Sequence, residues 1–214
     1  MKNFTTLILV LMIGICHAQN RDLEAQELLN QMSAMANGYD NMVLEFKYAL
    51  DNNEENIHQE TTGDITLVGD NYVLNILGIT RIFDGEKLIT ISPEDEEVTI
   101  SRQNIVEENT ITTSELLNFY KEGYNYKMDI IQNVKGRKIQ YIKLTPIDSN
   151  TEINYVLLGI DTTTKHVYKL IEIGNNATKT TLTIKAFKTN QPLSKSLFTF
   201  NASKYNDYYI NNLD

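Results

Sequence analysis

Few residues of this chain combine the types and spacing that active-site chemistry requires. His58 and His166 each stand alone, without a second ligand at metal-site spacing, and we interpret both as solvent-facing. The acidic run at 94–97 is typical of a solvated hairpin tip, and the run at 51–55 lacks the ligand spacing of a calcium loop. Neither a Gly-x-Ser-x-Gly elbow nor a glycine-rich phosphate loop is present. We therefore expect no enzyme, catalytic residue, metal or cofactor.

The sequence instead offers a capacity to bind apolar ligands. Large apolar side chains recur at every second position of β-rich segments, so a sheet would present them on one face. Tyrosine and methionine suit adaptable apolar sites, and burying an acyl chain yields about 0.8 kcal/mol per methylene. For any single residue, filling a core is the simpler interpretation. As a set, the candidate cavity residues are Leu44, Phe46, Tyr48, Tyr72, Leu74, Ile76, Phe83, Tyr126, Met128, Tyr141 and Tyr155.

The elements that would position these residues are almost all strands. Alternation and turn pairs such as Asp84-Gly85 predict antiparallel strands that are apolar on both faces, since Tyr72 points one way and Val73 and Leu77 the other. So many strands in one sheet should curl or close around a cavity, which makes the fold mainly β. The expected strands lie near 42–50, 60–68, 71–77, 79–84, 87–92, 97–102, 124–132, 137–146, 152–160, 166–174 and 178–188, with a terminal piece at 196–200.

Two helices are expected to cover the open mouth of this sheet. Apolar residues at three- and four-residue spacings predict an amphipathic helix over 22–37, ended by Gly38. A capping box of Thr112 and Glu115 predicts a short helix over 112–122. We expect the second helix to act as a lid through Leu116, Leu117, Phe119 and Tyr120.

The first residues are typical of an export signal. Lys2 precedes an apolar run, and Cys16-His17-Ala18 fits a cleavage site, so we expect a cleaved signal peptide over 1–18 and a single domain over 19–214. Lipid anchoring at Cys16 is the alternative, and Ile15 disfavours it. The formal charge of −9 argues against nucleic acid as a partner. Removal of Cys16 would leave a chain that depends on its core alone.

An ordered series of motifs resembles the periplasmic outer-membrane lipoprotein carrier (LolA) family, especially forms from Bacteroidota-type bacteria. The series runs in order along nearly the whole mature chain. It comprises Phe46, Gly-Asp-Ile-Thr-Leu at 63–67, Tyr-Val-Leu at 72–74, Phe-Asp-Gly-Glu-Lys-Leu at 83–88, Ser-Pro-Glu-Asp-Glu-Glu-Val at 92–98, Thr-Ser-Glu-Leu-Leu at 113–117, Leu-Thr-Pro at 144–146, Asp161 and Phe-Thr-Phe at 198–200.

The resemblance implies an unclosed antiparallel β-barrel of about eleven strands, with short helices as a lid over an apolar cavity. It also implies a periplasmic carrier that accepts triacylated lipoproteins from an inner-membrane ABC transporter and releases them at the outer membrane, where an acceptor would take them. We expect a monomer. Many family members carry arginine where this chain has Val73. Two alternatives stay open: a binder of another lipid, such as a glycolipid or fatty acid, and an interaction module with a filled core.

Overall fold

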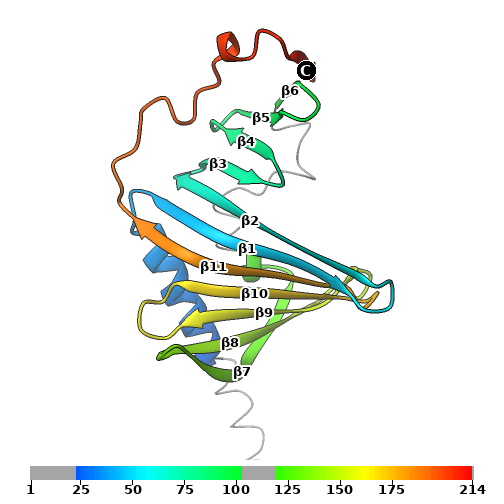
Figure 1. Ribbon diagram of the computed structural model, residues 1–214. Coiled ribbons are helices and arrows are strands. Elements are labelled where there is room, and N and C mark those ends of the chain that lie inside the picture. The colour runs from blue at the N-terminus through cyan, green and yellow to red at the C-terminus, as the bar shows by residue number, and fades with distance from the viewer. Residues whose placement is uncertain (1–22, 103–118, 214) are drawn as a thin grey trace, which may run out of the picture.

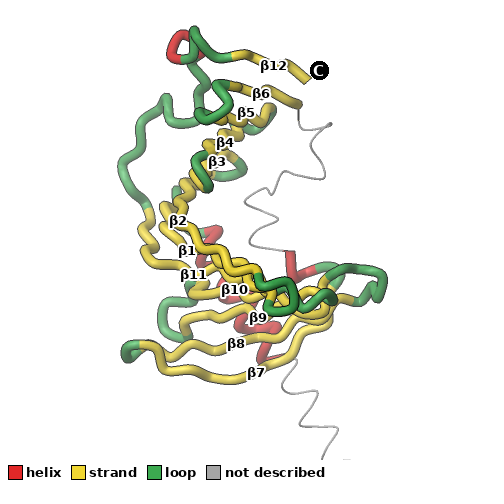
Figure 2. The backbone as a smooth tube through the Cα atoms, turned by 45° about the vertical axis from the view of Figure 1, so that its right-hand side comes forward, coloured by secondary structure: helices red, strands yellow, loops and turns green. Residues whose placement is uncertain are grey.

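The computed structural model describes residues 23–102 and 119–213, which form one twelve-stranded sheet (Figure 1). Its strand order is β12-β6-β5-β4-β3-β2-β1-β11-β10-β9-β8-β7, and the two end strands do not pair, so the sheet is curved but not closed (Figure 2). The strands are β1 (Met42–Asn52), β2 (Ile57–Val68), β3 (Asn71–Ile76), β4 (Ile79–Phe83), β5 (Lys87–Ser92), β6 (Glu97–Arg102), β7 (Tyr124–Val134), β8 (Arg137–Pro146), β9 (Ile153–Asp161), β10 (Val167–Gly174), β11 (Lys179–Thr189) and β12 (Tyr209–Leu213).

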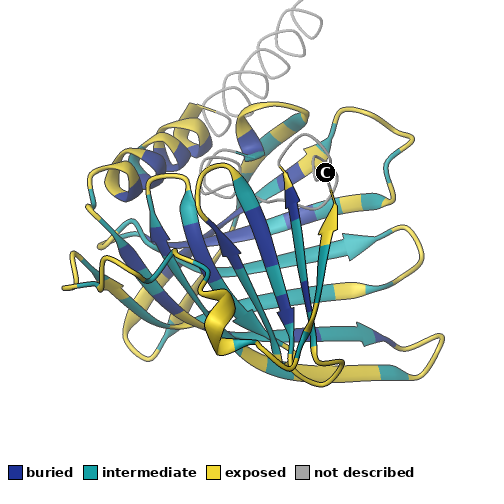
Figure 3. Cartoon of the chain, turned by 90° about the horizontal axis from the view of Figure 1, so that it is seen from above, coloured by how far each residue is buried: buried dark blue, intermediate teal, exposed yellow. Residues whose placement is uncertain are grey.

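The predicted first helix is present over residues 23–37 and packs on one half of the sheet. Its apolar stripe forms one cluster with β8 and β9, and Figure 3 shows its buried positions facing the strands. We call this face of the sheet the inner face and the opposite one the outer face. The helix ends where the Gly38 amide donates to the Met35 carbonyl at 3.2 Å. The cluster contains Ala25, Leu28, Leu29, Met32, Tyr120, Ile142, Leu144, Val156, Leu158 and Ile160.

A second cluster joins the end of this helix to β1–β5. Here the rings of Tyr72 and Phe83 stack with centroids 5.7 Å apart. Full burial of such side chains stabilises the fold by about 1.5–3 kcal/mol each. The fully buried members are Ala36, Met42, Leu44, Leu67, Tyr72, Phe83 and Leu88.

A third cluster lies on the outer face and explains why β3–β6 are apolar on both sides. The segment after β11 crosses this face and places Phe198 and Phe200 on it. The predicted strand at 196–200 is therefore wrong, because this segment forms turns that cover the sheet. The sheet residues of the cluster are Val73, Ile82, Ile89, Ile91 and Val98, and the covering residues are Leu197, Phe198, Phe200, Tyr205, Tyr208 and Ile210.

The mainly β, unclosed fold that was predicted is confirmed, with differences in detail. The eleven main strands lie within three residues of their expected bounds, and β12 is an additional strand that pairs parallel to β6. It is parallel because the chain first crosses the outer face and then returns in the direction of β6. Leu77 does not lie on the second face of a strand. It occupies the β3–β4 turn with φ 54° and is 68% exposed.

Most of the predicted lid helix at 112–122 falls outside the described residues. Its described part contains the 3-10 turn η1 (Phe119–Lys121). Within residues 23–102 and 119–213, no helix is long and apolar enough to cross a membrane.

Candidate ligand-binding face

The register of the sheet decides which side chains share the inner face. Ile142 and Leu158 contact the helix and lie opposite each other, so their cross-strand partners face the same side. Leu170 pairs with Leu158, Leu182 pairs with Leu170, and Tyr48 pairs with Leu182. The pairings of β1 with β2, β2 with β3 and β3 with β4 extend this face to the other half of the sheet.

Most predicted cavity residues lie on this inner face, but they differ in how far they are buried. Four of them are buried, namely Leu44, Phe46, Tyr72 and Phe83. Leu74, Tyr126 and Met128 are half-buried and pack against the first and second clusters. Tyr48 and Ile76 are half-buried and lie outside all three clusters.

Tyr141 and Tyr155 lie on the outer face, because each directly precedes an inner-face residue in its strand. The ring of Tyr141 covers Gly159, where an added Cβ would lie 2.9 Å from Tyr141 Cε1. Burial raises the pKa of the Tyr141 phenol, and the neighbouring Tyr168 adds to this effect. The ammonium of Lys143 sits 3.9 Å from the ring centroid of Tyr155. These two tyrosines stabilise the outside of the sheet, so we remove them from the candidate lining.

The inner face carries further half-buried apolar residues that sequence reasoning missed. They lie beside Tyr48 and Ile76 on β1, β4 and β11, and none of them belongs to the three clusters. Their alternation within 178–188 was a visible signal, but it did not show which face they take. Together with Tyr48 and Ile76 they form a set that we call the open strip: Tyr48, Leu50, Ile76, Ile79, Leu182 and Ile184.

The described part of the predicted lid is anchored to the helix. Tyr120 is buried, and its hydroxyl donates a hydrogen bond of 2.9 Å to the carbonyl of Leu29. Burial raises the pKa of this phenol. The half-buried ring of Phe119 packs edge-on against Tyr120 and Tyr124. Leu116 and Leu117 lie outside the described residues.

A hollow of about 650 Å³ opens between the first half of the helix, β7, β8 and the β9–β10 turn. Leu28 and Met128 give it an apolar wall, and Gln140 and Lys138 give it a polar one. Gln140 is buried and donates to the Asp129 carbonyl at the bulge of β7. The full lining is Leu23, Glu24, Gln26, Glu27, Leu28, Asn30, Gln31, Met128, Ile131, Lys138, Gln140, Thr162 and Lys165.

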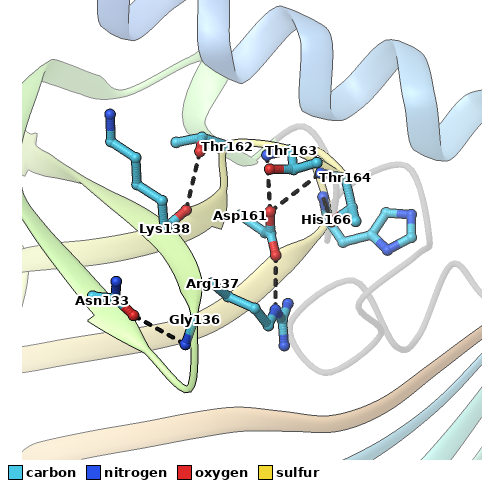
Figure 4. A network of polar contacts seen from close by, with 9 residues as sticks. All are labelled: Asn133, Gly136, Arg137, Lys138, Asp161, Thr162, Thr163, Thr164 and His166. Carbon is cyan, nitrogen blue, oxygen red and sulfur yellow. Dashed lines mark hydrogen bonds and ion pairs between the residues drawn. The ribbon is translucent and has the colours of Figure 1, made fainter.

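The β9–β10 turn that borders this hollow is held by one buried carboxylate (Figure 4). Asp161 accepts hydrogen bonds from the amides of Thr163 and Thr164 and from Arg137 Nε at 2.7 Å. Burial by itself would raise the pKa of Asp161, but the Arg137 and amide hydrogen bonds outweigh it and hold the pKa below its usual value. The turn thereby keeps Thr162 and Lys165 at the rim of the hollow.

His166 is half-buried rather than solvent-facing as predicted. Its ring stacks on Phe187 with centroids 3.9 Å apart, and its Nε2 lies 2.8 Å from the Tyr39 hydroxyl. Burial lowers the pKa of His166; Asp161 opposes this effect and Arg137 adds to it. Within the described residues, no three histidine, cysteine or acidic side chains cluster as metal ligands do. The contacts of His166 are those of a packing residue that joins the end of the helix to β10 and β11.

Residues 79–201 match the family model described as outer membrane lipoprotein carrier protein LolA. The chain belongs to this family. The match begins at Ile79, the first residue of β4, so β1–β3 and their inner-face side chains precede the matched part of this LolA family member. No curated protein matches the sequence.

Solved structures are similar to this LolA family member at low sequence identity. An uncharacterized conserved protein from Thermus thermophilus superposes with a TM-score of 0.61 at 9% identity, over 88% of this chain and 98% of that one. A LolA superfamily protein from Nitrosomonas europaea gives 0.43 at 13% identity, over 82% and 97%. The lipoprotein LppX from Mycobacterium tuberculosis gives 0.49 at 14% identity, over 79% and 98%. The Thermus structure supports the fold alone.

Proposed function

We propose that this protein is a carrier that holds the acyl chains of lipoproteins on the inner face of its sheet. The observation that carries the proposal is the open strip in a member of the LolA family. These half-buried apolar side chains lie beyond the first cluster, so an acyl chain could complete their burial. Each methylene buried there would contribute about 0.8 kcal/mol, so no charged contact is needed for affinity.

The transport cycle that we propose follows from this role. A cleaved signal peptide over 1–18 would deliver the domain to the periplasm as a monomer. The domain would then accept triacylated lipoproteins from an inner-membrane ABC transporter and pass them to an acceptor at the outer membrane. The protein would act as a chaperone rather than as an enzyme. Depletion in the native host should then leave lipoproteins at the inner membrane.

A carrier of a single lipid, such as a glycolipid or fatty acid, is the second candidate. The hollow beside Met128 favours it, because Lys138, Gln140 and Thr162 offer polar contacts next to the apolar Leu28. A head group could occupy the hollow while chains lie on the inner face.

The test replaces one residue of the open strip with a charged one. Ile76→Asp should abolish retention of acylated cargo, because an ionised carboxylate cannot be buried against a hydrocarbon chain without a large cost. Thr62→Asp is the matched control, since Thr62 is exposed and pairs with Lys47 on the outer face of the neighbouring strand. Both variants are purified from periplasm, checked by circular dichroism and analysed by native mass spectrometry.

The mass of the bound species separates the candidates. A lipoprotein mass supports the carrier, whereas a mass of a few hundred daltons favours the single-lipid binder. Equal occupancy of a folded Ile76→Asp variant and the wild type would remove the open strip from the mechanism. A wild-type protein with no bound species under any condition would favour the interaction module.

A further inference from the structure

A polar row crosses the inner face beside the open strip. Arg81 of β4 lies opposite Leu74 of β3 and Thr90 of β5, and Thr90 in turn lies opposite Thr99 of β6. Neighbouring strands are about 4.8 Å apart, so one guanidinium and two hydroxyls follow each other in a line. Two residues along the same strands, Ile76 pairs with Ile79 in the open strip. The inner face therefore changes from apolar to polar between Leu74 and Arg81.

The guanidinium N–H groups of Arg81 have no hydrogen-bond acceptor among the described residues. Its side chain is half-buried, yet no described residue forms an ion pair or hydrogen bond with its guanidinium. A guanidinium carries five N–H donors in a fixed fork, and leaving them unpaired away from water is costly. The carboxylate of Glu97, on the same face of β6, accepts a 3.0 Å hydrogen bond from the Thr99 hydroxyl, so that hydroxyl is not available to a ligand.

The electrostatics of Tyr72 agree with this placement. Burial raises the pKa of the Tyr72 phenol, and the positive charge of Arg81 acts in the opposite direction. Arg81 therefore exerts its field on the same face that Tyr72 occupies, next to the apolar second cluster.

We infer that Arg81, assisted by Thr90, binds an anionic oxygen group at the polar end of an acylated ligand. The inference rests on the proposed function, in that the acyl chains occupy the open strip. A phosphate or carboxylate can accept two parallel hydrogen bonds from a guanidinium, and such charge-assisted hydrogen bonds are stronger than hydrogen bonds between neutral groups. The ligand is then an amphiphile that straddles the boundary between Leu74 and Arg81, with its chains over Ile76 and Ile79.

The test compares two lipids that differ only in the head group. Delipidated full-length protein is titrated with short-chain phosphatidylglycerol and with diacylglycerol of the same chains. Arg81→Gln should weaken phosphatidylglycerol binding by about tenfold or more and leave diacylglycerol binding within about twofold. Arg102→Gln is the matched control, because Arg102 is an exposed arginine on β6 whose strand position faces the outer side. Circular dichroism checks the fold of each variant.

A milder variant and a second ligand source complete the design. Thr90→Val keeps the shape of the side chain and removes one hydroxyl, so it should weaken phosphatidylglycerol binding by about threefold even if Arg81→Gln folds poorly. A triacylated lipopeptide with aspartate or asparagine after its acylated cysteine distinguishes a peptide carboxylate from a lipid phosphate. If the anionic group is a peptide carboxylate, Arg81→Gln should weaken binding of the aspartate lipopeptide and leave binding of the asparagine lipopeptide unchanged.

The outcomes separate the two proposals. If a folded Arg81→Gln variant loses binding of both lipids to the same extent, or loses neither, the role of Arg81 is overturned, and acyl binding by the wild type still supports the proposed function. A wild-type protein that binds neither lipid and no lipopeptide would refute the proposed function and the inference with it.

Discussion

Replacing Gly63 with alanine should strain the inner face where β1, β2 and β3 meet. Gly63 of β2 lies opposite Phe46 and Ile76, and the Phe46 ring occupies the space above it. An added Cβ would lie 2.7 Å from Phe46 Cζ and 2.5 Å from the carbonyl oxygen of Asn75. The ring can move, but the carbonyl belongs to the neighbouring strand. The Phe46 ring would be pushed toward the open strip.

The expected loss in the free energy of unfolding is the difference between a steric cost and an entropic gain. Overpacking a well-filled site costs about 1–3 kcal/mol. Alanine recovers about 0.5–1 kcal/mol, because glycine loses more backbone entropy in a strand. Because the Asn75 carbonyl cannot give way easily, the upper half of the overpacking range applies, about 2–3 kcal/mol, and the free energy of unfolding should fall by about 1–2.5 kcal/mol. For a domain of this size, each kilocalorie corresponds to about 2–4 °C in the melting temperature.

Urea unfolding monitored by circular dichroism measures this loss. A double-mutant cycle with Phe46→Leu should recover part of it, since the smaller side chain relieves the ring contact and not the contact with the Asn75 carbonyl. Gly38→Ala is the control, because its added Cβ would lie 3.4 Å from the nearest atom. Gly63→Ala with wild-type stability, or with no coupling to Phe46→Leu, would refute this account of the inner face.

Two further predictions concern pH and the C-terminal segment. Burial lowers the pKa of His166 in the folded chain, so the unfolded state binds its proton more readily, and the free energy of unfolding should fall as the pH drops below about 6.5. His166→Gln should flatten this slope in thermal melts from pH 7.5 to 5.5, and an unchanged slope would contradict the assignment. A chain that ends at Thr189 loses the cover over Val73 and Ile82, so it should self-associate in size-exclusion chromatography; a stable monomer would show that this cover is dispensable.

Some of the candidate site could be predicted because strand periodicity is local. Alternation located the strands and grouped Tyr72, Leu74 and Ile76 on one side. It could not decide which side of each strand faces inward. In β8, both odd- and even-numbered residues are buried, so the sequence does not tell the face of Tyr141 from that of Ile142. Strand pairing and the contact with the helix assign the two faces. Arg81 was passed over for the same reason, because its exposure and lack of a described partner depend on β3 and β5.

The sequence by itself determined the helix over 23–37, the eleven main strands and the mainly β character, since each follows from side-chain spacing within a short segment. Only the tertiary structure decided that the segment after β11 covers the outer face of β3–β6, and that β12 joins β6 in parallel. Those contacts join residues about a hundred positions apart, and no local pattern encodes which apolar surface a distant aromatic residue will bury.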